Sequence, residues 1–295
     1  MKYISKLINS FLLLILVIIS VFFACGEQAT TENQTGIEII RNTKVLKSVN
    51  EVFETLPSPM ETSELIVQAD VKFNDRILNP VRNVPYYETS KSLALNLGIY
   101  CADMSYVSHY NQKQLTMEYL SAIKTLADNL GIIQVMSKND IIMLEDNVYN
   151  QDSIRIIIKD VFFSSNEYLN ESNRPEMALL VQVGGWIEGL YIAMQLATQS
   201  VDINKELVDR IVEQKESLNL VLKSLKNYSE YAGIDDIYMD MLQLQKIYNR
   251  TNIYDSDSIQ NAPENMADKS KANVTPEIFI SLYKEINNIR NDYTQ

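Results

Sequence analysis

Residues 176–199, EMALLVQVGGWIEGLYIAMQLATQ, form the stretch that decides the fold. They are apolar on nearly every side of a helix, and a helix of that composition lies inside a protein core or a membrane. We therefore expect a central helix here, surrounded by other helices. Glu188 is the only acid between Glu176 and Asp202, so it is the residue that fits this apolar environment least.

A second stretch, residues 96–106 (NLGIYCADMSY), shares one property with the first: small residues recur at helical spacing. They are Gly98, Ala102 and Ser105 in this stretch, and Gly185, Gly189 and Ala193 in the other. A glycine inside a helix costs about 1 kcal/mol relative to alanine, and that loss is useful only where another backbone approaches closely. We therefore predict that the two helices cross and bring Asp103 and Glu188 into one neighbourhood.

The remaining apolar spacing predicts a series of helices behind a proline-broken segment, residues 56–85, that holds one short helix near 62–70. The further helices are expected at residues 86–109, 112–130, 139–148, 152–170, 203–231, 235–249 and 275–293. The last begins with Thr275-Pro276-Glu277, a favourable helix start. These elements predict an all-α fold, a compact and irregular multi-helix bundle in one domain over residues 56–295. Within it, a polar exposed loop is expected at 251–274, and the helix 275–293 should dock on the body.

Composition excludes several classes of function. The formal net charge is -12, which argues against nucleic-acid binding because that needs a cationic surface. The chain has one histidine, His109, and two cysteines, Cys25 and Cys101. We therefore expect no multi-histidine metal site, no CxxC zinc site and no disulfide framework. Every glycine lies in the tether, directly after a helical stretch or inside a helical pattern. None is therefore available for a phosphate-binding loop, and we expect no nucleotide cofactor.

The N-terminal residues have the features of an export signal. Lys2 and Lys6 precede an apolar run over residues 11–23 that only Ser20 interrupts. Its end, Phe22-Phe23-Ala24-Cys25, resembles a bacterial lipobox. That resemblance implies removal of residues 1–24, lipidation of Cys25 and a membrane anchor; an uncleaved membrane anchor is the alternative. In lipoproteins of this kind, an aspartate directly after the lipidated cysteine retains many of them at the inner membrane. Here Gly26 follows Cys25, and the resemblance therefore implies an outer-membrane lipoprotein that faces the periplasm or the cell surface.

Residues 25–55 then predict a tether, polar and rich in Thr and Gln at its start. The lone Cys101 lies inside an apolar helical pattern, where burial as a small hydrophobic residue is expected.

The candidate site residues are acids and aromatic residues of the two unusual stretches: Asp103, Glu188, Tyr100, Tyr106, Trp186 and Tyr191. Three interpretations stay open. The two carboxylates are structural acceptors in a packed core, or they line a tyrosine-rich pocket for a ligand or cation, or they form an acid–base pair. An enzyme needs both carboxylates in an open cleft, whereas a structural role needs them buried and hydrogen-bonded.

Residues 56–200 resemble a group of uncharacterised helical lipoproteins of the Bacteroidetes, through residues 96–100 (NLGIY), 102–106 (ADMSY) and 184–191 (GGWIEGLY). The triplets that contain Ser153 and Ser258 (Asp-Ser-Ile in both) are similar to the O-glycosylation sequon of that phylum. The resemblance implies an exported lipoprotein and assigns no activity. We expect a non-enzymatic module that binds an unidentified protein or small molecule; the alternative is a hydrolase that uses Asp103 and Glu188.

Overall fold

The computed structural model describes residues 56, 59–68, 71–135, 150–198, 205–253 and 272–295. These residues are mainly helical, which confirms the predicted all-α class. The helices are α3 (Pro59–Gln68), α4 (Ser90–His109), α5 (Lys113–Asn129), α7 (Gln151–Glu171), α8 (Pro175–Ala197), α9 (Lys205–Glu213), α10 (Lys215–Asn227), α11 (Ile234–Tyr248) and α13 (Pro276–Tyr293). Shorter 3-10 helices are η1 (Asp75–Ile77), η2 (Val81–Tyr86) and η3 (Ile133–Val135). Two short strands, β1 (Asn252–Ile253) and β2 (Ala272–Asn273), pair antiparallel.

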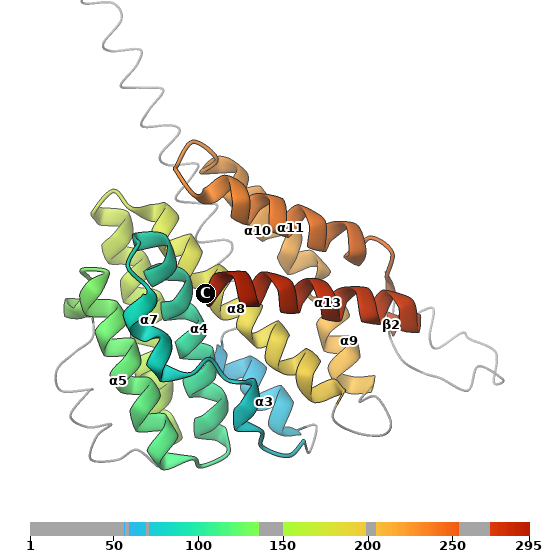
Figure 1. Cartoon of the computed structure of the whole chain (residues 1–295), viewed down its shortest axis with the longest axis horizontal. Coiled ribbons are helices and arrows are strands. Elements are labelled where there is room, and N and C mark those ends of the chain that lie inside the picture. Colours follow the sequence, from blue (N-terminus) through green and yellow to red (C-terminus); the bar gives the residue numbers. More distant parts are fainter. Residues whose placement is uncertain (1–55, 57–58, 69–70, 136–149, 199–204, 254–271) are drawn as a thin grey trace, which may run out of the picture. The chain divides into compact units, whose positions relative to one another are not determined.

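Helix α8 is the central helix, as its composition predicts. All its residues except Pro175, Tyr191 and Gln195 are buried. It packs most extensively against α4, and also against α3, α7, α9 and α13 (Figure 1). In the described part of the chain, α8 alone is long and apolar enough to span a membrane, but 94% of its most apolar window is buried in the protein. That degree of burial is expected of a core helix.

Helices α4 and α8 cross in close backbone contact, which confirms the predicted crossing. A Cβ atom added to Gly98 would lie 2.0 Å from the carbonyl oxygen of Val181, and one added to Gly184 would lie 2.0 Å from that of Leu95. Real Cβ atoms do not approach backbone atoms so closely, so only glycine fits at these two positions. Gly189, by contrast, faces the side chain of Thr62 on α3 rather than α4.

Side-chain caps set where two of the site-bearing helices begin. The Thr89 hydroxyl accepts a hydrogen bond from the Ser92 backbone N–H at 3.0 Å, and the Ser92 hydroxyl accepts from the Thr89 N–H at 3.1 Å. Helix α4 therefore begins at Ser90, four residues later than predicted, because residues 81–86 form η2 instead. The Thr275 hydroxyl caps α13 by accepting from the Ile278 N–H, as the Thr-Pro-Glu start predicts.

The single helix expected over residues 203–231 is wrong. The chain breaks at Gln214 into α9 and α10, and the Gln214 N–H bonds back three residues to the Ile211 carbonyl. The Gln214 side chain is held from outside the helix, because its Oε1 accepts from the Trp186 indole N–H at 3.1 Å. The break in the regular helix therefore coincides with a tertiary contact at Gln214.

The prediction of an exposed loop over residues 251–274 is wrong for its first residue, while residues 254–271 lie outside the described residues. Thr251 is buried, its hydroxyl donates to the Tyr248 carbonyl at 2.7 Å, and β1 and β2 pair the flanking residues. Several other predictions concern segments outside the described residues: the signal peptide 1–24 with Cys25, the tether 25–55, the helix 139–148, and Ser258 within the loop.

Candidate functional site

The crossing of α4 and α8 brings Asp103 and Glu188 together, and α13 contributes Arg290, which pairs with Glu188. Asp103 and Glu188 have 0% exposure, and Arg290 has 7%. Arg290 Nε donates to Glu188 Oε2 at 3.0 Å, and Arg290 Nη2 donates to Glu188 Oε1 at 3.1 Å. This two-bond geometry is the strongest arrangement available to a guanidinium and a carboxylate. We refer to Asp103, Glu188 and Arg290 as the charged centre.

Arg290 has further partners that complete its environment. Its guanidinium carbon lies 4.6 Å from the centre of the Tyr191 ring, and its Nη2 lies 3.5 Å from the Ile77 carbonyl oxygen. Desolvation lowers the pKa of Arg290, but the combined attraction of Glu188, Asp103 and Tyr191 raises the pKa overall. Arg290 is therefore a permanent cation in the core, and it supplies the positive charge that the buried acids require.

Asp103 is the less satisfied of the two acids. Its Oδ2 accepts from the Asn79 backbone N–H at 3.1 Å, while its Oδ1 has no hydrogen-bond partner. Desolvation and the neighbouring charge of Glu188 raise the pKa of Asp103 well above its ordinary value, and Arg290 and Asn79 only partly offset them. Two carboxylates facing one guanidinium carry one excess negative charge. A proton on Asp103 makes the charged centre neutral and gives the acid a donor toward Glu188.

Asparagine and tyrosine side chains extend this polar region around Asn79. The Asn79 amide nitrogen donates to the Tyr87 hydroxyl at 2.9 Å and to Asn96 Oδ1 at 3.2 Å, and its backbone carbonyl accepts from the Tyr119 hydroxyl at 2.9 Å. The Asn96 amide in turn donates to the Tyr293 carbonyl of α13 at 2.8 Å. The network therefore joins the segment before α4, helices α4 and α5, and the end of α13 into one body.

The predicted tyrosines act within the same framework. Tyr100 has 0% exposure and its hydroxyl donates to the Pro80 carbonyl at 2.8 Å. The Tyr106 hydroxyl accepts from the Asn74 backbone N–H at 2.9 Å, and its ring stacks on Phe73 with centroids 5.4 Å apart. Both tyrosines thus bond backbone groups of residues 74–80. Of the six candidates, only Trp186 lines the hollow described below, so they do not share that cavity.

Two further residues singled out from the sequence are buried. Burial raises the pKa of the Cys101 thiol, which therefore stays neutral, as expected of a small core residue. Ser153 lies in α7 and is 8% exposed, so its side chain is covered in the folded chain. Across the described residues, no group of three or more His, Cys, Asp and Glu side chains is arranged to hold a metal ion.

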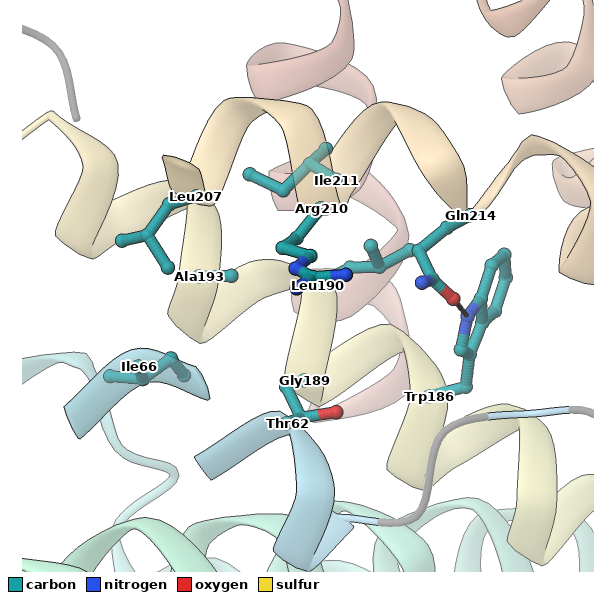
Figure 2. A pocket seen from close by; sticks show the side chains of 10 residues that line it. All are labelled: Thr62, Ile66, Trp186, Gly189, Leu190, Ala193, Leu207, Arg210, Ile211 and Gln214. Atoms are coloured by element: carbon teal, nitrogen blue, oxygen red, sulfur yellow. Dashed lines mark hydrogen bonds between the residues drawn. The ribbon is translucent and has the colours of Figure 1, made fainter. Parts of the chain in front are cut away.

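A separate hollow, distinct from the charged centre, opens between α3, α8 and α9 (Figure 2). Its cavity volume is about 40 Å³, within a wider depression of about 420 Å³ that includes space open to solvent. Most of its wall is aliphatic, formed by Ile66, Leu190, Ala193, Leu207 and Ile211. Trp186, Gln214 and Arg210 complete one side, and the Trp186–Gln214 hydrogen bond fixes the indole there.

No protein-family model, curated protein or solved structure matches the chain. The resemblance to helical lipoproteins of the Bacteroidetes therefore stays a prediction. Three residues of importance here, Arg290, Asn79 and Arg210, were not among those predicted from the sequence. Arg290 follows Ile286 by four residues and therefore lies on the apolar stripe of its helix, the one local signal that could have identified it.

Proposed function

We propose that the chain is an exported, membrane-anchored lipoprotein that works as a non-enzymatic binding or interaction module. One observation supports the non-enzymatic part above all: Asp103 and Glu188 have 0% exposure and face Asn79 and Arg290 rather than a cleft. A general acid or base must come within hydrogen-bond distance of its substrate. A hydrolase built on these carboxylates would need the α4–α8 crossing to open, which would break the core.

The anchor is proposed from the sequence pattern. The basic residues Lys2 and Lys6, the apolar run and Cys25 together favour lipidation of Cys25 and attachment through a lipid. Gly26 favours the outer membrane, where the helical body would face the periplasm or the cell surface. In that location the partner of the body would be another protein or a small molecule, as the acidic net charge argues against nucleic acid.

Intact-mass analysis of the protein extracted from membranes tests the anchor. The expected mass lacks residues 1–24 and includes acyl chains on Cys25. Cys25→Ser should prevent both processing and lipidation. The matched control is Cys101→Ser, which changes the buried thiol and should leave processing and acylation intact. A mature protein that retains Met1, or normal processing of Cys25→Ser, would refute the proposal.

A further inference from the structure

The last residues of α13 are held to the body by side chains of several other elements. The Tyr293 hydroxyl donates to Asp240 Oδ2 of α11 at 3.3 Å, and Tyr293 is packed into the body, since it is 6% exposed. On the backbone, the Tyr293 carbonyl accepts from the Asn96 amide at 2.8 Å, and the Thr294 carbonyl accepts from the Tyr87 hydroxyl at 3.4 Å. These last residues therefore cover two buried donors of the polar network, on Asn96 and Tyr87.

Asp240 is the acid at this contact, and other acids surround it. Those that face it are Asp236 of α11 and Asp292 and Glu285 of α13. A cation close by, Lys91 of α4, is already paired with Asp236. Desolvation, with a smaller effect of the surrounding acids, raises the pKa of Asp240 to about 6, and the hydrogen bond from Tyr293 only partly offsets the rise. An ionised Asp240 is therefore poorly accommodated while Tyr293 stays packed beside it.

The contact three residues earlier in α13 does not weaken with rising pH in this way. Arg290 forms two hydrogen bonds with Glu188, and its guanidinium stays charged across the pH range in which proteins fold. When Asp103 ionises, it adds a second negative charge near Arg290 and strengthens the hold on this residue. Helix α13 is therefore fixed at Arg290, and ionisation of Asp240 can release only the residues beyond it.

We propose that Asp240 and Tyr293 form a pH-sensitive latch on residues 291–294, the C-terminal turn of α13. The latch holds this turn at mildly acidic pH, because the acid binds its proton more tightly in the closed state than in the open one. As the pH rises and Asp240 ionises, departure of the Tyr293 ring lets water reach the carboxylate. The turn then opens about Arg290 and uncovers the two buried donors. This latch goes beyond the proposed function and does not depend on it.

Hydrogen exchange of the full-length chain, measured by mass spectrometry, tests the latch. The protection factors of the C-terminal turn, corrected for the intrinsic pH dependence of exchange, should fall by about three- to tenfold from pH 5 to pH 8. That fall is smaller than the full shift of Asp240 would give, because the acid is only half-buried. The opening should be local, so a low concentration of urea that lowers the protection of α8 should leave that of the turn unchanged.

Two variants identify the groups of the latch. Asp240→Asn keeps an acceptor for the Tyr293 hydroxyl but carries no charge, so its C-terminal turn should stay protected at both pH values. Its matched control is Asp235→Asn, which should show the native fall, since Asp235 is an exposed acid of the same helix outside the group that faces Asp240. Tyr293→Phe keeps the ring but loses the hydrogen bond that favours the ionised acid, so its protection should fall more steeply than in the native protein.

The proposal is overturned if the turn keeps the same protection from pH 5 to pH 8, or if Asp240→Asn retains the native fall. It is also overturned if the turn and α8 share one protection factor and one urea dependence, because the turn then opens only when the whole chain unfolds. An unchanged or shallower fall in Tyr293→Phe would likewise refute the latch. The acylation of Cys25 plays no part in these measurements, so the two proposals fail independently.

Discussion

Arg290 and Glu188 lie 102 residues apart in the chain and form a two-bond ion pair in the core, with nitrogen–oxygen distances of 3.0 and 3.1 Å. The pair joins the last helix, α13, to the central helix, α8. Asp103 of α4 lies beside it and completes the charged centre. The C-terminal helix is therefore held by buried charge as well as by the apolar stripe that docks it.

The backbone crossing predicts a large difference between glycines of the same helix. Gly184→Ala should destabilise the fold by about 3 kcal/mol or more, since its Cβ would meet the Leu95 carbonyl and neither backbone can move away cheaply. Gly189→Ala is the matched control on α8, because its Cβ would meet Thr62 Cγ2 at 3.1 Å, and that side chain can shift. Urea denaturation followed by circular dichroism measures both; equal losses would contradict the crossing.

The fold should tolerate replacement of Asp103 by asparagine but not its truncation to alanine. Asp103→Ala removes the acceptor of the buried Asn79 N–H and should lower the free energy of unfolding by about 1–3 kcal/mol. Asp103→Asn keeps an acceptor for Asn79 and supplies an N–H donor toward Glu188, so it should be as stable as the native protein or more stable at pH 7. Thermal unfolding at pH 7 distinguishes the two variants, and a large loss in Asp103→Asn would show that the ionised carboxylate is required.

The pH dependence of stability follows from the raised pKa of Asp103. Its ordinary value is 3.8, so between that pH and its raised pKa the folded state binds more protons than the unfolded state. The contribution of Asp103 to the free energy of unfolding is therefore complete below pH 3.8, and it is lost as the pH rises through the raised pKa of Asp103 in the folded state. Chemical denaturation across the pH range should show a smaller decline above pH 3.8 in Asp103→Asn than in the native protein.

Asp240 provides an independent comparison in the same experiment. Desolvation raises the pKa of Asp240 to about 6, a change that its hydrogen bond from Tyr293 partly offsets. Asp240→Asn should remove a decline confined between pH 3.8 and about 6, where this acid ionises in the folded state. If neither variant alters the pH profile, these acids titrate alike in the folded and unfolded states, contrary to the environments described.

Much of the crossing could be predicted because its signal is local. Glycine in a helix sacrifices helix propensity, and repeated small residues at helical spacing show which face a neighbour approaches. The neighbourhood of Asp103 and Glu188 follows from that crossing, since each lies close along its helix to the residues in contact. The prediction erred in detail, because Gly184 rather than Gly189 meets α4.

Arg290 could not be identified in the same way. An arginine near a helix C-terminus is favourable for electrostatic reasons alone, and most such residues are solvated. What makes Arg290 different is a partner on α8, and that pairing depends on how α13 docks. The hollow escaped prediction for a similar reason: the apolar spacing continues across Gln214 from Ile211 to Leu218, so nothing in it shows the break between α9 and α10.

The central claim is that the buried acids belong to the framework of the fold, and a double-mutant cycle on Glu188 and Arg290 tests it most directly. Arg290→Met leaves buried acids without a counter-charge and should cost about 3–5 kcal/mol. Glu188→Gln removes the two-bond partner of the guanidinium but should cost less, about 1–3 kcal/mol, because Asp103 can then ionise and supply the counter-charge. The double variant should cost less than the sum of the two by about 2–3 kcal/mol. Costs that add to within about 0.5 kcal/mol would contradict the account, because they would mean that the two side chains do not interact in the folded protein.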